Sequence, residues 1–280
     1  MLLEVAIGDA YGAGFEFSPQ ERVNELNTVT QYEKHGLDSI IPGRYTDDTQ
    51  MSIAVAEVII NAKEWSRETF ADSFVNAFKR DERKGYAKGF YEFLMNCGSG
   101  TELLEKINPT SIRNGAMMRS VPIGMIPYLD VVKQVAEIQA SITHNTPSGI
   151  LSSQLVAVAS HLLMRDCPVK SLKPMLFSIF QGNDNINYDW EGRVPCDAEA
   201  TISAMFTSFC RNSSMTELLQ DCVAFGGDTD SVASVALGLA SLTSSYVNDL
   251  PSFLYDDLEN GKFGKDFLIR LDMQCIMAFN

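Results

Sequence analysis

The sequence predicts an all-α fold, and three observations support that prediction. Apolar residues recur at helical spacing in several segments, and helix-start signals precede some of them. The alternation of apolar and polar residues that marks half-buried strands is scarce. The 280 residues are 45% hydrophobic and 21% charged, a composition typical of globular chains and unlike disordered or collagen-like ones. Because no stretch has the composition of a flexible linker, we expect one compact domain over residues 1–280.

Two predicted helices carry start signals with a physical cause. The segment Ser18-Pro19-Gln20-Glu21 places a hydroxyl at the cap, proline at the first helical position and a carboxylate at the third. The segment Ser214-Met215-Thr216-Glu217 has the same form. In both segments, side chains satisfy backbone donors that a helix start leaves unpaired. We therefore expect helices that begin directly after Ser18 and Ser214.

Apolar periodicity predicts the other helices. Three phenylalanines four residues apart form one stripe on a helix that we expect to begin near Ser66, and core packing explains them better than a cofactor does: Phe70, Phe74 and Phe78. Further apolar segments at helical spacing are residues 51–62, 131–141, 151–164, 201–209 and 232–242. Residues 181–193 are polar and rich in Asn, Asp and Gly, so they are expected to form an exposed loop.

The net charge and the cysteine pattern indicate which binding partners and which cellular compartment to expect. The chain has 22 Lys and Arg against 36 Asp and Glu, a net charge of −14, whereas binding nucleic acid or an anionic membrane by bulk charge needs clustered cations. Residues 1–14 carry two acids in an apolar stretch, unlike a secretory signal, and residues 232–242 are too short to span a bilayer. Six dispersed cysteines without a C-x-x-C pair argue against a zinc knuckle or a disulfide framework. We expect a cytoplasmic protein with reduced thiols.

Two acidic motifs stand directly before predicted helices. The first, Thr46-Asp47-Asp48-Thr49, precedes the apolar run 51–62, and the second, Gly226-Gly227-Asp228-Thr229-Asp230-Ser231, precedes the run 232–242. A carboxylate at a helix start is stabilised by free backbone amides and by the helix dipole, so each motif alone is explained as a cap. One cap, however, needs one acceptor, and each motif offers two carboxylates and two hydroxyls. The surplus indicates a site.

The donor types in these motifs favour a hard metal ion. Oxygen atoms of Asp, Thr and Ser suit Mg²⁺, Mn²⁺ or Ca²⁺, and the three histidines and scattered cysteines leave little for zinc or copper. A third segment, residues 8–16, ends in Glu16, and its glycines are too loosely spaced for a dinucleotide fingerprint. If Glu16 and the four aspartates converge, five carboxylates repel one another, and two divalent ions would cancel four of the five charges. Spacing alone does not establish that convergence.

These motifs, in this order, resemble those of the ADP-ribosylglycohydrolase family. The matching segments run through nearly the whole chain: Gly8-Asp9 to Glu16, Thr46-Asp47-Asp48-Thr49-Gln50-Met51, Asn114-Gly115-Ala116-Met117-Met118-Arg119 with Pro122, Thr143-His144, and Gly226-Gly227-Asp228-Thr229-Asp230-Ser231. The resemblance implies an all-α fold with two Mg²⁺ ions, or Mn²⁺ in some members, at the bottom of an ADP-ribose cleft.

The resemblance also implies a role for individual residues. The ligands of one ion would be Thr46, Asp47, Asp48 and Asp230, and those of the other Asp228, Asp230 and Ser231. The candidates for catalysis are Glu16, Asp47 and Asp228. The candidates for substrate binding are Asn114, Gly115, Met118 and His144. Asp230 would bridge the two ions.

Three departures from the family pattern concern specificity. Ser231 stands where many members carry Thr, and it still supplies a hydroxyl. Arg113 stands where members often carry Gly, so the cleft wall and the preferred leaving group are expected to differ. Some members place an extra acid or an aromatic gating loop between positions 79 and 97, and here that segment gives no clear match. The run 79–84 mixes charges of both signs and is expected to form a solvated face.

The resemblance implies a Mg²⁺-dependent glycoside hydrolase that releases ADP-ribose from an ADP-ribosylated protein or small molecule. Cleavage at the anomeric carbon of ribose develops positive charge on the ring, which nearby carboxylates stabilise. Two alternatives stay open at this point. One is a catalytically silent ADP-ribose-binding or crystallin-like structural protein, and the other is a binuclear phosphohydrolase. The acceptor and the oligomeric state are not indicated by the sequence.

Overall fold

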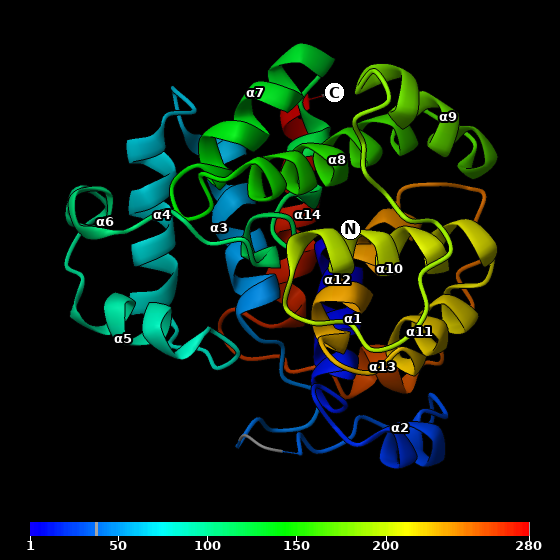
Figure 1. Cartoon of the computed structure of the whole chain (residues 1–280). Helices are drawn as coiled ribbons and strands as arrows, with labels where there is room; N and C mark the ends of the chain where they lie inside the picture. The colour runs from blue at the N-terminus through cyan, green and yellow to red at the C-terminus, as the bar shows by residue number, and fades with distance from the viewer. Residues whose placement is uncertain (37–38, 280) are drawn as a thin grey trace.

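The computed structural model describes residues 1–36 and 39–279, and within them it contains α-helices, two short 3₁₀ helices and no β-strand (Figure 1). The all-α prediction is confirmed. The helices are α1 Leu2–Ala13, α2 Gln20–Leu26, α3 Asp47–Asn61, α4 Arg67–Arg80, α5 Lys88–Asn96, α6 Gly100–Lys106, η1 Asn114–Ala116, η2 Val121–Met125, α7 Leu129–Ala140, α8 Pro147–Leu163, α9 Val169–Ile179, α10 Ala198–Arg211, α11 Met215–Ala224, α12 Thr229–Ala240, α13 Phe253–Asp256 and α14 Lys265–Phe279.

The first and twelfth helices form the centre of the molecule and touch backbone to backbone. A Cβ atom added at Gly8 would lie 2.4 Å from the carbonyl oxygen of Ala233, and one at Gly12 would lie 2.5 Å from the Cα of Asp230. Only glycine permits that approach, and the two glycines are one helical turn apart on the same face of α1. The hydroxyl of Thr229 donates to the carbonyl oxygen of Gly12 at 2.8 Å. The start of α12 is therefore fixed against α1.

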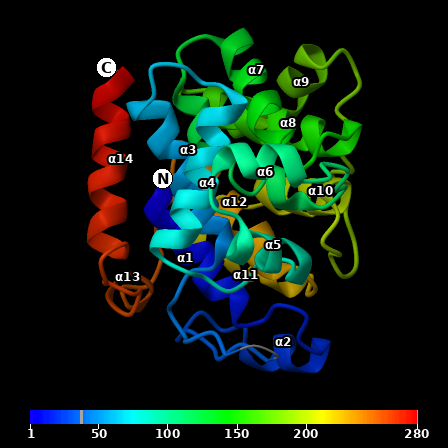
Figure 2. The ribbon, with the colours of Figure 1, turned by 90° about the vertical axis from the view of Figure 1, so that its left-hand side faces the viewer.

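The other helices pack around this central pair. Helix α3 contacts α1, α4 and α14, and α10 and α11 contact α12. Helices α7 and α8 pack together on the far side of η2, and Figure 2 shows α14 running along one flank of the molecule. Buried apolar side chains from α1 to α14 form one continuous hydrophobic cluster. In the described residues, no helix is both long enough and apolar enough to cross a membrane.

Most of the predicted helix starts are confirmed. Ser66 accepts a hydrogen bond from the backbone N–H of Thr69 and begins α4, and Ser214 accepts one from Glu217 and begins α11. The phenylalanine stripe of α4 is fully buried. The prediction for Ser18 is wrong, because Pro19 takes the cap position of α2 and the buried hydroxyl of Ser18 makes no hydrogen bond with any residue that the structure describes. The predicted loop 181–193 is confirmed, and all six cysteines are unpaired.

One surface prediction is also wrong. The run 79–84 is not uniformly solvated, because Arg83 is only 5% exposed. Its guanidinium pairs with Asp81 and Glu259 and donates to the backbone carbonyl of Tyr45. The guanidinium also lies over the Tyr45 ring, 3.8 Å from its centroid. Arg83 thus ties the segment before α3 to the segment before α14.

Candidate active site

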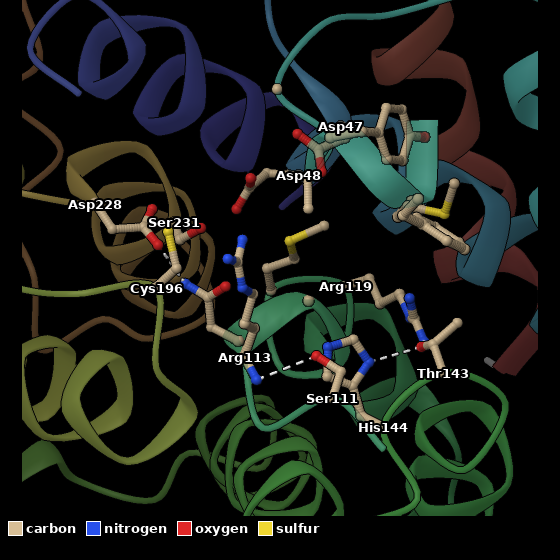
Figure 3. A pocket seen from close by; sticks show the side chains of 18 of the residues that line it. Asp47, Asp48, Ser111, Arg113, Arg119, Thr143, His144, Cys196, Asp228 and Ser231 are labelled. Atoms are coloured by element: carbon tan, nitrogen blue, oxygen red, sulfur yellow. Dashed lines mark hydrogen bonds between the residues drawn. The ribbon is translucent and has the colours of Figure 1, made fainter. Parts of the chain in front are cut away.

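The two acidic motifs meet at a pocket of about 560 Å³ beside the N-terminal ends of α3 and α12. Figure 3 shows Asp47 and Asp48 on one side of the pocket and Asp228 and Ser231 on another. The pocket lining includes all but one of the site residues named from the sequence: Glu16, Asp47, Asp48, Asn114, Gly115, Met118, His144, Asp228, Asp230 and Ser231. The exception is Thr46, which lies directly behind Asp47 and is buried.

Asp9 on α1 fixes the N-terminal end of α3. Its carboxylate accepts hydrogen bonds from the backbone N–H of Thr46 at 3.0 and 3.1 Å and from that of Thr49 at 3.0 Å. It also accepts from the Thr46 hydroxyl at 2.8 Å and from the Thr49 hydroxyl at 2.6 Å. Asp9 has no solvent exposure, and burial raises its pKa to about 6. Asp9 therefore caps the N-terminal end of α3, and Asp47 and Asp48 face the pocket instead.

A tight turn before α12 brings the second motif to the same place. Gly226 and Gly227 have φ angles of +68° and +85°, and a Cβ at Gly227 would meet the carbonyl oxygen of Val194 at 2.0 Å. Asp228 occupies the cap position of α12, yet its side chain makes no cap hydrogen bond. It accepts instead from the side-chain amide of Asn114 at 2.7 Å. The interpretation of these aspartates as simple helix caps is wrong for both motifs.

The carboxylates form a cluster suited to a hard cation. Oxygen atoms of Glu16, Asp228 and Asp230 all lie within 4.8 Å of one another. Burial raises the pKa of Asp47, Asp48 and Asp230 well above the usual range, and neighbouring carboxylates raise it further. Within residues 1–36 and 39–279, no Lys or Arg pairs with the aspartates of the two motifs. Oxygen donors with this excess of negative charge fit divalent metal ions.

The opposite wall of the pocket is formed by η1 and the segment before α8. The His144 ring packs against Gly115, and its Nδ1 is 2.7 Å from the Thr143 hydroxyl (Figure 3). Burial lowers the pKa of His144 to about 3, so the ring is neutral. Arg119 is buried behind this wall, where it donates to Gln139 and Thr143. These hydrogen bonds make Arg119 a structural brace for the wall.

Several pocket residues escaped the sequence analysis. The Nε2 of His35 lies 3.0 Å from a carboxylate oxygen of Glu16. Cys196 lies beside Asp228 in the pocket wall. Tyr86, Phe90 and Phe93 give the pocket an aromatic side. The spacing of Phe90 and Phe93 on a short amphipathic segment was the one signal available for them; nothing in the sequence links His35 or Cys196 to the acidic motifs.

The helical fold carries a pocket with clustered carboxylates, a neutral histidine and aromatic side chains, an arrangement typical of an enzyme active site. The chain belongs to the ADP-ribosylglycohydrolase family, whose model matches residues 1–277. It is therefore a hydrolase that acts on a glycosidic bond of ADP-ribose.

Similar proteins agree with that assignment. The chain is 24% identical to the ADP-ribosylarginine hydrolase Tri1 of Pseudomonas putida (strain GB-1), over 85% of this chain and 68% of that protein. It is 24% identical to the ADP-ribosyl-(dinitrogen reductase) glycohydrolase of Rhodospirillum rubrum, over 89% and 86%. It is 26% identical to the ADP-ribosylhydrolase ARH3 of Xenopus tropicalis, over 59% and 49%. A solved structure titled ADP-ribosylglycohydrolase-related protein complex has the same fold, with a TM-score of 0.76 at 21% identity over 99% of this chain and 95% of that one.

Proposed function

We propose that the protein is a Mg²⁺-dependent hydrolase that releases ADP-ribose from an ADP-ribosylated protein or small molecule. The observation that carries the proposal is the gathering of oxygen donors from α3, α12 and the end of α1 in one pocket. Relatives named as ADP-ribosylarginine hydrolase and ADP-ribosylhydrolase support the substrate class. Two Mg²⁺ ions, replaceable by Mn²⁺, would balance the cluster.

The donor set fits two such ions. We assign Thr46, Asp47, Asp48 and Asp230 to one ion, and Asp228, Asp230 and Ser231 to the other. The hydroxyl proton of Thr46 points to Asp9, so the oxygen lone pairs are free for a cation. When bound, the ions would orient the ribose hydroxyls and lower the pKa of a water molecule.

The residues of this chain then supply proton transfer, stabilisation of charge and binding of the substrate. Glu16, beside His35, is placed at the pocket edge to hold or deliver a proton. The carboxylates of Asp47 and Asp228 stabilise positive charge that develops on the ribose ring. The wall that carries Asn114 and His144 confines the substrate, and the neutral His144 ring offers one nitrogen for a hydrogen bond. We expect Gly115 and Met118 to contact the substrate from the same wall.

Two further expectations belong to this proposal. We propose that residues 1–280 form one domain, which the continuous hydrophobic cluster from α1 to α14 supports. We also propose a cytoplasmic location, which the six unpaired cysteines support.

A substrate panel tests the function. The protein is incubated with arginine-linked, serine-linked and O-acetyl ADP-ribose in Mg²⁺, with a chelated sample as control. We expect free ADP-ribose that depends on the metal ion. AMP with ribose 5-phosphate would instead identify a phosphohydrolase, and no turnover would identify a binding or structural protein.

Matched variants test the site. Asp228→Asn is expected to lower turnover at least 10³-fold while the protein stays folded. Asp72→Asn makes the same chemical change on α4, where the carboxylate accepts from the N–H of Gly100, and is expected to leave turnover unchanged. Full activity of Glu16→Ala with the normal metal content would remove Glu16 from the acid/base role.

A further inference from the structure

Arg113 is an exposed residue that places a permanent positive charge at the wall of the pocket. It lines the pocket directly before η1, and Figure 3 shows its side chain reaching toward the side that holds Asp48 and Asp228. Within the described ranges 1–36 and 39–279, the guanidinium takes part in no ion pair and donates no hydrogen bond. An arginine side chain stays protonated at any physiological pH. The group is therefore a cation with unused donors.

Hydrogen bonds hold the backbone at Arg113 in place. Its N–H donates to the hydroxyl of Ser111 at 3.2 Å, and the next residue, Asn114, is bound to Asp228 at 2.7 Å and to Thr201 at 3.1 Å. Its charge acts on both sides of the pocket, since it is felt by the His144 ring and by the Cys196 thiol beside Asp228. Arg113 thus lies between the acidic cluster and the His144 wall.

The positive charge of Arg113 affects which leaving group the reaction favours. In the function proposed above, the ribose is held over the carboxylates, so the bond at its anomeric carbon breaks within the same small pocket. A guanidinium acceptor would bring a second positive charge close to Arg113, and like charges repel each other. An oxygen acceptor gains electron density as the bond breaks, and a guanidinium donor stabilises that density.

We propose that Arg113 is a specificity-determining residue that favours oxygen-linked ADP-ribose over arginine-linked ADP-ribose. The inference rests on the proposed glycohydrolase function. In the step that it favours, the bond between the anomeric carbon and the acceptor oxygen breaks, and a water oxygen bonds to that carbon. One proton of the water goes to the acceptor oxygen, so the products are free ADP-ribose and an alcohol or a carboxylic acid.

The test is a ratio of kcat/KM for O-acetyl or serine-linked ADP-ribose to kcat/KM for ADP-ribosylarginine. In the wild-type protein we expect the ratio to exceed 1. In Arg113→Gln, which removes the charge and keeps donors, we expect it to fall at least tenfold. Arg113→Lys restores the charge and is expected to restore most of the ratio. Arg270→Gln, at an exposed position of α14, makes the same charge change away from the pocket and is expected to leave the ratio unchanged.

The outcomes separate the inference from the function on which it rests. Free ADP-ribose from both linkages with a ratio that changes less than twofold in Arg113→Gln overturns the role of Arg113 and leaves the function intact. An unchanged ratio together with weaker binding of ADP-ribose, measured by calorimetry, likewise overturns it and assigns Arg113 to the pyrophosphate. No ADP-ribose from any linkage overturns the proposed function, and the inference about Arg113 with it.

Discussion

Replacing Asp9 tests how the first acidic motif is held in place. The buried carboxylate is the acceptor for two backbone N–H groups and two hydroxyls of Thr46 and Thr49, at 2.6 to 3.1 Å. Asp9→Ala leaves both N–H groups without that acceptor, and each orphaned buried donor costs about 1–3 kcal/mol. Removing a buried carboxylate offsets part of this cost, because its desolvation is relieved. We expect the free energy of unfolding to fall by roughly 2–4 kcal/mol.

Asp9→Asn separates stability from ion binding. An asparagine oxygen at the Oδ2 position keeps three donors: both N–H groups and the Thr49 hydroxyl. Its NH₂ group then faces the Thr46 hydroxyl, which must turn its own proton away from residue 9. That proton would point toward the proposed ion site. We expect a loss of about 1 kcal/mol in stability or less, and about tenfold weaker Mg²⁺ binding.

Urea denaturation and calorimetric titration with Mg²⁺ measure the two effects. Asp72→Asn is the matched control, and it is expected to bind Mg²⁺ as the wild type does. The reasoning is refuted if Asp9→Ala unfolds within 0.5 kcal/mol of the wild type, a difference ordinary for a surface substitution. It is also refuted if Asp9→Asn binds Mg²⁺ with unchanged affinity.

Three further predictions concern packing, ion binding and pH. Gly12→Ala places a Cβ 2.5 Å from the Asp230 backbone, so the free energy of unfolding, measured in urea, should fall by about 3 kcal/mol. The control Gly89→Ala on α5 meets no described atom within 4 Å and should not destabilise the protein. Equal stabilities of the two variants would contradict the packing argument. Mg²⁺ at one hundred times its Kd should stabilise the wild-type protein by about 2.7 kcal/mol. Without Mg²⁺, Asp230→Asn should be more stable than the wild type, because one repelling carboxylate is gone. The variant should gain little stability when Mg²⁺ is added. The folded state keeps the pKa of His144 near 3, so below pH 6.5 only the unfolded chain binds a proton at this residue, and the folded state becomes less stable as the pH decreases. Between pH 7 and pH 5, the free energy of unfolding of the wild type should decrease by about 2 kcal/mol more than that of His144→Asn. The same pH dependence in both proteins, measured by urea denaturation, would refute this.

The sequence was sufficient to predict several of the helices and the clustering of acidic residues in one pocket. Periodicity located α4 and its buried phenylalanines, because a 3.6-residue repeat is a local property. The chemistry of Asp, Thr and Ser oxygens predicted a hard-cation cluster before any position was known. Each of these features depends on neighbours in the chain.

The features that the sequence left out depend on contacts between distant segments. Asp9 and Thr46 are neighbours only because α1 packs against α3, so the surplus of acceptors in the first motif gave no hint that another helix supplies the cap. In the sequence, Arg83 looks like any solvated surface cation, because its partner Glu259 becomes its neighbour only in the fold. Ser18 satisfied the rule for a cap, yet Pro19 occupies the cap position and α2 begins at Gln20, one residue later than expected.

The glycine contact between α1 and α12 also bears on how the active site assembles during folding. The oxygen donors of the two motifs are separated by about 180 residues, so the cluster forms only when segments far apart in the chain come into contact. Because α12 meets α1 backbone to backbone at Gly8 and Gly12, beside Asp230, a small separation of the two helices would break the cluster while most helices persist. Catalytic competence should therefore vanish under mild denaturant before helical circular dichroism declines.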